Sequence, residues 1–383
     1  MSADADLLII GGGCAGLSLA MRLTERGPRT IVLEAREKYV DDRTWCFWDD
    51  GSAPLHSLVS HSWPAVTVRA GPIASRLDCA NTPYRMLPSR AFYDAATRRI
   101  AATERITLEQ PSRVLAKPEK TGDVWRVETN LGPRTARMVV DTRPITPARG
   151  GAVLWQSFAG REIECVDEKF DPATAELMDF APPGPDRVAF IYVLPVSRTR
   201  ALIEFTVFGP DPLDRATLAA DLEAAVARRT GGAGCTTLRE ESGILPMGIA
   251  PQPASADPTF VRAGLTAGAA RPSTGYAFQR IQRWADSCAQ ALIDGSPPSP
   301  HSPDPLLVRV MDRILLAVIR TDPANAPRLF ATLFARADTA KIIRFLSDRG
   351  TLADYAAIVW ALPKVPFIRR LPHAVFNRRL LAA

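Results

Sequence analysis

The chain has 383 residues, 46% hydrophobic and 23% charged, and carries a formal net charge of +6 from 47 Lys and Arg against 41 Asp and Glu. These values are typical of a globular protein and exclude long disordered or collagen-like structure, and the length allows two or three domains. The positive charge is too dilute to indicate a nucleic-acid partner, and the sequence contains no zinc-finger pattern or long basic run.

The first predicted elements are a strand over residues 6–10, a helix over residues 14–25 and a second strand over residues 30–34. Both strands are short apolar runs. The helix has apolar residues at helical spacing, and Gly27 and Pro28 end it. This order of elements predicts the beginning of a parallel α/β sheet.

The rest of the chain is predicted to contain more strands, an antiparallel hairpin and a helical tail. The predicted elements are a helix over 89–104 with Ser89 as its N-cap, strands over 114–116, 124–129, 136–141 and 153–158, hairpin strands over 187–194 and 199–208, a helix over 214–230, a Pro-rich connection over 246–258, a strand over 260–263, a helix from about Gly275 to 293, a linker over 296–305 and helical chain over 306–381.

A glycine-rich turn connects the first strand to the first helix. Residues 11–16 fit the pattern GxGxxG, which is weak alone but strong between a strand and a helix. Gly11 allows the tight turn, Gly13 lets the backbone approach a pyrophosphate, and Gly16 lets helix and strand pack closely. The helix N-terminus offers N–H groups to the phosphates, and Glu34 is expected to accept hydrogen bonds from the adenosine ribose. The sequence therefore predicts a dinucleotide site.

A second glycine-rich segment favours FAD over NAD. Residues 264–276 follow a predicted strand and open a helix whose N-terminus is expected to face a flavin ring. Pro272, Thr274 and Gly275 are the candidate contacts, and the alternative is a helix-capping loop that binds no ligand. Arg90 is a candidate for the pyrophosphate, although an ordinary surface arginine explains it equally well.

The predicted fold class is α/β, with a Rossmann-type FAD-binding parallel sheet domain, an inserted antiparallel β-sheet substrate domain and a helical C-terminal part. The FAD-binding domain is expected in three segments, residues 1–75, 85–148 and 258–295, with the substrate domain over 149–257 and the helical region, including a membrane-facing surface, over 303–383.

Cysteine and histidine spacing gives no sign of a metal site. The four histidines form no HxxxH pair, and no two of the six cysteines lie closer than 32 residues. The cysteines are therefore predicted to be free thiols in a reducing compartment. No apolar run is long enough for a transmembrane helix, and acidic rather than basic residues precede the uncharged residues 7–21, so we expect no signal peptide there.

Several segments together resemble the bacterial lycopene β-cyclases, which belong to a wider group of flavoprotein hydroxylases. The more specific matches are P-S-T-G-Y at 272–276 and L-I-E-F-T at 202–206. The others are residues 7–34, 43–45, 178–180, 241–246 and 345–372.

The resemblance implies an enzyme that closes a six-membered ring at each end of lycopene, giving γ-carotene and then β-carotene. The implied reaction is an isomerisation without net electron transfer. It nevertheless requires FAD in the reduced state, with NAD(P)H as the reductant.

Glu204 is the candidate catalytic residue. Ring closure begins with a proton delivered to a terminal alkene, and the apolar neighbours of Glu204 are expected to desolvate its carboxylate and raise its pKa. Once ionised, the same group is expected to stabilise the cation or to accept the proton released after ring closure. The family often has a second acid at the next position, where this chain has Phe205. We therefore expect one carboxylate, rather than two, to carry out the catalysis. The alternative is a solvent-exposed strand face, because Arg200 shares the face of Glu204.

The implied cation and hydrocarbon suggest further partners. The candidate aromatic walls for the cation are Trp45, Phe47, Trp48, Trp155, Tyr192 and Tyr276. A C40 hydrocarbon does not cross water freely, so we expect a peripheral enzyme on the cytoplasmic side of the inner membrane. Residues 355–383 carry five basic side chains and no acid among apolar residues, a pattern typical of an interfacial segment. The alternative is a helix packed on the body with a solvated basic face.

Two rival functions stay open at this point. One is an FAD-dependent NAD(P)H monooxygenase of the hydroxylase type acting on an apolar substrate. The other is a carotenoid-binding flavoprotein without activity. The acid at position 204 argues against both.

Overall fold

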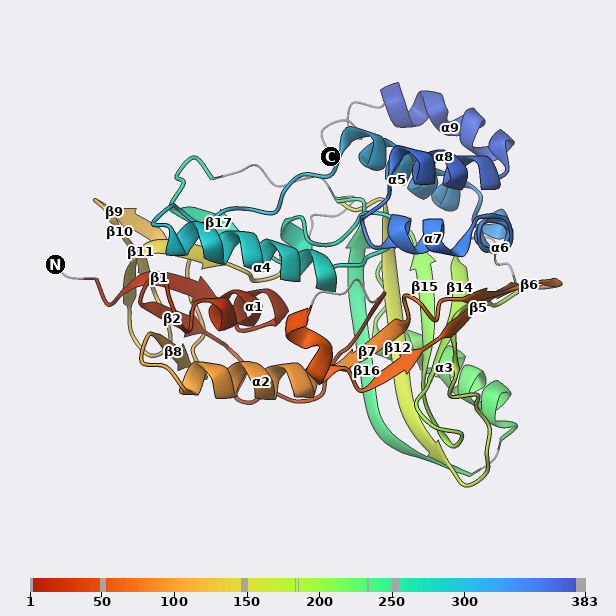
Figure 1. Ribbon diagram of the computed structural model, residues 1–383, viewed down its shortest axis with the longest axis horizontal. Coiled ribbons are helices and arrows are strands. Elements are labelled where there is room, and N and C mark those ends of the chain that lie inside the picture. Colours follow the sequence, from red (N-terminus) through yellow and green to blue (C-terminus); the bar gives the residue numbers. More distant parts are fainter. Residues whose placement is uncertain are drawn as a thin grey trace.

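A computed structural model describes residues 3–48, 53–145, 151–182, 184, 186–232, 234–249 and 255–376. Two large sheets lie next to each other along the length of the molecule (Figure 1). Helices α1, α2 and α4 lie with the first sheet, and helices α5 to α9 gather at one end of the second (Figure 1).

The first sheet is the predicted parallel sheet. Its strands run in the order β8-β2-β1-β11-β10-β9, and β17 pairs with β11. The pairs among β8, β2, β1, β11 and β17 are parallel, whereas β10 pairs antiparallel with its neighbours. The bounds are β1 Ala5–Ile10, β2 Thr30–Leu33, β8 Ile106–Glu109, β9 Glu119–Thr121, β10 Val124–Val127, β11 Arg134–Asp141 and β17 Phe260–Arg262.

Alternation along β1 divides the core of this half of the molecule. Leu7 and Ile9 face the helices α1 (Cys14–Arg22), α2 (Ser89–Ala101) and α4 (Phe278–Ile293) and share one apolar cluster with them. Leu8 and Ile10 belong to a cluster on the other face, with residues of β10 and β11. Because both faces of β1 are buried, its sequence is a continuous apolar run.

The second sheet is mostly antiparallel. Its order is β16-β12-β15-β14-β13-β5-β6, and only the β5–β13 pair is parallel among its described pairs. The bounds are β5 Ala65–Ala70, β6 Ile73–Asp78, β12 Leu154–Cys165, β13 Thr174–Phe180, β14 Val188–Pro195, β15 Arg200–Gly209 and β16 Cys235–Met247.

The two faces of the second sheet have different partners. Ile203 and Phe205 pack with residues of α3 (Arg215–Thr230) on one face. Leu202 and Phe208, on the alternate positions of β15, belong to a cluster with the C-terminal helices on the other face. Glu204 shares this second face.

A small sheet of β3 (Thr44–Trp48), β7 (Tyr84–Pro88) and β4 (His61–Trp63) connects the two halves. Trp45 and Phe47 pack against the core of the first half, whereas Trp48 is buried in the core of the second. Strand β3 therefore has one face toward each half of the molecule.

The C-terminal part is helical, as predicted. Its helices are α5 Leu306–Thr321, α6 Ala326–Arg336, α7 Thr339–Leu346, α8 Leu352–Ala361 and α9 Lys364–Phe376, and short 3-10 turns occur at Ala53–Leu58, Leu265–Ala267 and Pro323–Asn325. None of the helices in the described part of the chain has the length and apolar character needed to cross a membrane.

Three sequence predictions need correction. The segment 1–75 is not uniform, because β5 joins the second sheet through β13, 104 or more residues later in the chain. Strand β16 includes Pro246 and Met247, the first residues of the predicted Pro-rich connection over 246–258, because it pairs along its length with the distant strand β12. The N-cap of α2 is Pro88 rather than Ser89, and α4 begins at Phe278 rather than near Gly275.

The prediction of six free cysteines is also wrong for one pair. Cys165 and Cys235 form a disulfide, although they lie 70 residues apart. They are direct partners at one end of the β12–β16 ladder, a register that cysteine spacing does not reveal. Cys14, Cys46, Cys79 and Cys288 are free.

Candidate functional site

In the glycine turn (residues 11–16), Gly11, Gly12 and Gly16 leave no room for a side chain, whereas Gly13 faces open space. Gly11 has a φ of 99°, and a Cβ there would lie 2.7 Å from Thr142 Oγ1. A Cβ on Gly16 would lie 1.9 Å from the carbonyl oxygen of Gly11. A Cβ on Gly13 would meet no atom within 4 Å. The backbone at Gly13 is therefore open to a ligand, at the start of a helix whose first turn has no side-chain cap.

Glu34 lies directly against this turn. It is buried, and its Oε2 accepts a 2.7 Å hydrogen bond from the N–H of Gly12. Its Oε1 accepts from the backbone N–H and the Nε of Arg36, at 2.7 and 3.0 Å. A carboxylate has further acceptor positions, so these bonds are compatible with a ribose as an additional donor.

Arg36 is a contact that the sequence analysis missed. Its Nη2 donates to the carbonyl of Gly12 at 3.0 Å, and its guanidinium lies over the rings of Tyr39 and Tyr93. Its position two residues after Glu34 was the one feature of the sequence that could have indicated a contact with the glycine turn. Arg90, the arginine singled out for the pyrophosphate, instead donates to both carboxylate oxygens of Asp94 at 2.9 Å on the exposed side of α2.

The 272–276 loop lies at the same sheet edge as the glycine turn. It follows β17, which runs parallel to β11 and so ends where β1 ends. Gly275 has a φ of 71°, and a Cβ there would lie 2.9 Å from Oε1 of Gln156 on the second sheet. That oxygen is buried and has no donor among the described residues.

Arg271 fixes this loop to the C-terminal helices. It is 1% exposed and pairs with Asp312 of α5 at 3.3 Å, and Ser273 Oγ donates to the same carboxylate at 2.7 Å. Its Nη1 also donates to the carbonyl of Phe345 in α7. The loop is therefore held rigidly between the two halves of the molecule.

These features fit FAD. The glycine turn offers open backbone and an uncapped helix start, and Glu34 provides acceptors for a ribose. The 272–276 loop lies against the buried unpaired Oε1 of Gln156 and precedes the uncapped start of α4.

Glu204 lies in a row of four residues that we call the acid row: Tyr192, Glu204, Gly160 and Glu241. They are direct neighbours in register across β14, β15, β12 and β16, so all four share one face of the sheet. Glu204 Oε1 accepts a 2.6 Å hydrogen bond from the hydroxyl of Thr206. The alternative of a solvent-exposed face is wrong, because this face packs against the C-terminal helices and β3.

Burial raises the pKa of Glu204 from 4.5 to about 8, with the charge of Glu241 acting in the same direction and the Thr206 hydrogen bond opposing it. A carboxyl group with this pKa is protonated at neutral pH and is able to donate a proton. The surroundings of Glu204 are therefore compatible with the role of proton donor that the sequence predicts.

Three tyrosine hydroxyls connect the acid row to the 272–276 loop. The hydroxyls of Tyr84 and Tyr192 lie 2.6 Å apart, and both interact with the hydroxyl of Tyr276. Burial raises the pKa of all three above the usual value of a tyrosine, so they remain neutral donors and acceptors. The thiol of Cys46 also faces the row, since the charges of Glu241 and Glu204 add to burial in raising its pKa.

The candidate aromatic walls divide into two groups. Tyr192 belongs to the acid row and Tyr276 lies beside it, and Trp48 lies next to Tyr84 with ring centroids 4.8 Å apart. Trp45 and Phe47 stack on Phe278 in the core of the first half, and Trp155 is on the opposite face of β12 from Gly160. The alternation of side chains along a strand explains the division.

Glu241 is the main residue that the sequence analysis did not predict as part of the site. It is buried, and its Oε2 accepts from Thr44 Oγ1 at 2.7 Å and from Arg239 Nη1 at 2.6 Å. Arg239 also pairs with Glu162 at 2.5 Å. A second carboxyl group therefore lies in the acid row although position 205 is Phe, and it comes from another strand.

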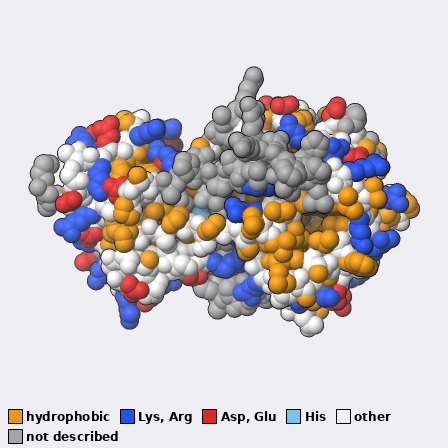
Figure 2. All heavy atoms as spheres, turned by 90° about the horizontal axis from the view of Figure 1, so that it is seen from above, with side chains coloured by type: hydrophobic (Ala, Val, Ile, Leu, Met, Phe, Trp, Pro, Cys, Tyr) orange, Lys and Arg blue, Asp and Glu red, His pale blue; other side chains and the backbone are white. Residues whose placement is uncertain are grey.

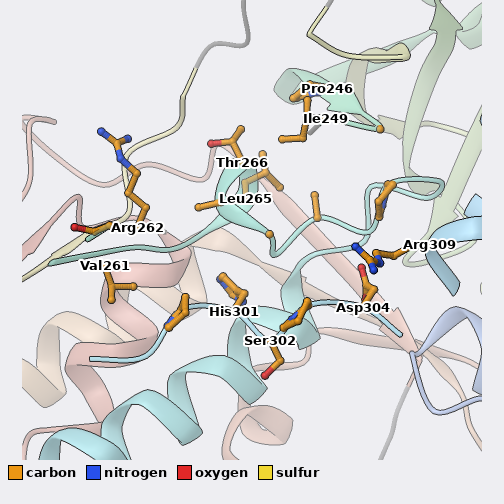
Figure 3. A pocket seen from close by; sticks show the side chains of 18 of the residues that line it. Pro246, Ile249, Val261, Arg262, Leu265, Thr266, His301, Ser302, Asp304 and Arg309 are labelled. Atoms are coloured by element: carbon orange, nitrogen blue, oxygen red, sulfur yellow. The ribbon is translucent and has the colours of Figure 1, made fainter. Parts of the chain in front are cut away.

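A cavity of about 680 Å³ lies beside the loop that follows β17 (Figure 3). Its walls come from residues 258–272, the linker 297–304, the end of β16 and α5, and they include Ile249, Leu265 and His301. Helix α5 contributes two cationic residues to the wall, Arg309 and Arg313. Among the described residues, the acid row and the glycine turn do not line it, whereas Pro272 does.

Exposed apolar side chains concentrate on the C-terminal helices. In the described part of the chain, seven of the thirteen exposed large hydrophobic residues lie there, and Figure 2 shows hydrophobic side chains gathered over this half. They are Leu306, Leu307, Leu352, Val359, Trp360, Val365 and Ile368. Lys364 lies over the ring of Trp360, and Arg369 is exposed beside them. Arg378 and Arg379, also predicted for this surface, lie outside the described residues.

Within the described segments, no group of three His, Cys, Asp or Glu side chains is arranged to hold a metal ion.

Solved structures with a similar fold include flavoproteins. A geranylgeranyl bacteriochlorophyll reductase-like protein from Thermoplasma acidophilum has a TM-score of 0.64 at 13% identity, covering 96% of this chain and 98% of its own. Aklavinone-11 hydroxylase, in a complex with FAD and aklavinone, has a TM-score of 0.59 at 12% identity, covering 85% and 71%. The protein therefore has the fold of the hydroxylase-like flavoproteins.

The sequence identifies the family within this fold group. The family model described as lycopene cyclase protein matches residues 6–371, and the chain belongs to that family. Lycopene beta-cyclase from Paracoccus sp. (strain N81106 / MBIC 01143) is 30% identical over 400 residues, covering 96% of this chain and 97% of the relative. Lycopene beta-cyclase from Pseudescherichia vulneris is 28% identical, covering 94% and 95%. These findings confirm the resemblance and the predicted fold class.

Proposed function

We propose that this protein is a lycopene β-cyclase that converts lycopene through γ-carotene to β-carotene, using reduced FAD with NAD(P)H as the reductant. The observation that carries the proposal is Glu204, a buried carboxyl group with a pKa of about 8 on an enclosed face of the second sheet. A hydrocarbon has no polar group to activate, so the site itself must supply the proton.

Glu204 donates its proton to the terminal alkene of the substrate, and the second alkene then attacks the tertiary cation to close the ring. Tyr192, Tyr276 and Trp48 form the aromatic wall, and an aromatic face stabilises a nearby cation by roughly 0.5–2 kcal/mol. The fold around them excludes water, which would otherwise trap the cation.

Gly11, Gly13, Gly16 and Glu34 hold the dinucleotide portion of FAD, with Arg36 beside them. Pro272, Thr274 and Gly275 face the flavin, and we keep Arg90 as a candidate for the pyrophosphate. Reduced FAD, when bound, supplies an electron-rich charge that stabilises positive charge in the transition state.

The cavity beside Pro272 is assigned to the part of the polyene that is not being cyclised. Its walls are mainly apolar, which suits a hydrocarbon. Ile249→Trp narrows it and is expected to raise the KM for lycopene several-fold without changing the bound flavin.

The proposed location is the cytoplasmic face of the inner membrane, with the C-terminal helices against the lipid surface. Their exposed apolar residues and basic neighbours suit the boundary between acyl chains and anionic headgroups. This arrangement gives the protein access to a substrate that partitions into lipid.

The test is pigment analysis of a lycopene-accumulating bacterium that expresses the chain. Accumulation of β-carotene supports the proposal, and unchanged lycopene in cells that contain the flavin-loaded protein contradicts it. Purified enzyme with reduced flavin should cyclise lycopene without oxygen, whereas a monooxygenase of the hydroxylase type requires oxygen. A carotenoid-binding protein without activity would bind lycopene and release it unchanged.

A further inference from the structure

Two acids face each other across a glycine in the acid row. Gly160 is paired with Glu204 on one side and with Glu241 on the other. A Cβ on Gly160 would lie 3.5 Å from Cβ of Glu204 and 3.3 Å from Cγ of Glu241, so these two side-chain carbons are within about 7 Å of each other. Without a side chain at position 160, nothing from β12 separates the two carboxyl groups.

The surroundings of the two acids are opposite in character. Two donors, Thr44 and Arg239, converge on one oxygen of Glu241, which suits a carboxylate. Glu204 has a hydroxyl donor in Thr206 and no ion pair within the described segments. Neighbouring carboxyl groups in such different environments divide into an acid and a base.

We propose that Glu241 is a second catalytic residue, the base that takes the proton released after ring closure, whereas Glu204 supplies the proton that starts it. This inference rests on the proposed function. It assigns to Glu241 a step that a one-carboxylate site would leave to Glu204.

The reaction balances with these two groups alone. The O–H bond of Glu204 breaks, a C–H bond forms at the terminal alkene, and a tertiary cation remains. The electron pair of the second alkene forms the ring C–C bond, and the positive charge moves into the ring. A C–H bond next to that charge then breaks, its electron pair forms the ring double bond, and the proton moves to Glu241. Return of this proton from Glu241 to Glu204 restores the site, and nothing is oxidised or reduced.

The position of the base decides the product. The ring cation has three kinds of neighbouring C–H bond, and their loss gives two different positions of the double bond inside the ring and one outside it. Arg239 and Thr44 hold Glu241 at one place, so one isomer is favoured. Removing this base therefore changes which isomer forms, an effect that a purely structural role does not produce.

The test compares the products of Glu241→Gln with those of the wild-type enzyme, both loaded with FAD. We expect ring formation to slow by about 10²-fold or more. The remaining products should include isomers with a displaced ring double bond or alcohols formed by water. Glu241→Asp keeps a carboxylate on a shorter side chain. It should give the same product mixture as Glu241→Gln, but at a higher rate.

Glu162→Gln is the matched control, because Glu162 is equally buried and also pairs with Arg239. It should retain the wild-type product. The inference is overturned if Glu241→Gln gives the wild-type isomer at an undiminished rate, or if Glu162→Gln changes the products in the same way. Failure of the wild-type enzyme to form any ring would instead contradict the proposed function. Bound flavin and melting temperature show whether each variant is folded, and Glu241→Asp decides the result if Glu241→Gln is not.

Discussion

The glycine turn and the acid row are built from different kinds of sequence. The glycine turn is six consecutive residues, and its shape follows from local packing, such as that of Gly16 on Gly11. The acid row takes one residue from each of four strands, and its shape follows from their register. We infer that the turn serves cofactor binding and the row serves proton transfer, so mutations at the two places should have separable effects.

The largest effect is expected from Glu204→Gln, which keeps the shape of the side chain but removes the acid. Cyclisation should fall by about 10²- to 10⁴-fold, because the proton donor is lost. FAD content should stay at the wild-type level, and turnover and flavin absorbance measure the two quantities. Glu240→Gln is the matched control, since Glu240 adjoins Glu241 on the other face of β16. Cyclisation by Glu204→Gln at the wild-type rate would rule out Glu204 as the donor.

Gly13→Val should weaken FAD binding while the fold of the apoprotein stays intact. Gly13 has an extended backbone conformation that other residues adopt, and a Cβ there meets open space. The apoprotein should therefore melt at the wild-type temperature, while its affinity for FAD falls tenfold or more because the side chain fills the place proposed for the pyrophosphate. Flavin titration and thermal melting measure the two effects. Retention of wild-type affinity would exclude the proposed position of the dinucleotide.

Arg271→Met tests the support of the 272–276 loop. The substitution leaves Asp312 buried without its partner, and breaking such a pair costs about 3–5 kcal/mol of the free energy of unfolding. Arg336→Met, at an exposed position of α6, should change it by less than about 0.5 kcal/mol. Chemical denaturation of both variants provides the measurement. Equal stability of the two would mean that the loop is held by other contacts.

The smallest effect concerns the C-terminal surface. Ile368→Glu puts a charge on an exposed apolar position of α9 and should weaken sedimentation with anionic vesicles several-fold. Leu131→Glu, at an exposed position in a turn of the first half, should leave it unchanged. Equal vesicle binding by both variants would remove these helices from the membrane contact.

The sequence predicted the glycine turn, Glu34 and the 272–276 loop because each is a local pattern next to a predicted strand or helix. It predicted Glu204 through a short motif. Glu241 could not be predicted, since its proximity to Glu204 depends on β12 lying between β15 and β16 with a glycine at position 160.

The same limit explains the other differences. The Cys165–Cys235 bond and the membership of β5 in the second sheet are both long-range pairings. Trp45 and Trp155 were separated from the site by the direction of their strand faces, which depends on tertiary packing. Local patterns carry no information about register between distant strands.

The raised pKa of Glu204 also predicts how stability changes with pH. The folded protein keeps a proton on Glu204 up to about pH 8, whereas the unfolded chain releases it near 4.5. The stability that this proton contributes is therefore complete below about pH 4.5 and is lost as the pH rises through 8. Glu204→Gln has no such titrating group. The difference in free energy of unfolding between this variant and the wild type should therefore shift in favour of the variant as the pH rises from 5 to 9.

The most direct measurement of the central idea is infrared titration of the carboxyl group at position 204, taken as the difference between wild-type protein and Glu204→Gln. A protonated carboxyl band that is present at pH 7 and disappears near pH 8, together with the fall in cyclisation, is the predicted result. A difference spectrum that shows only carboxylate at pH 7, in an enzyme that still cyclises lycopene, would contradict it.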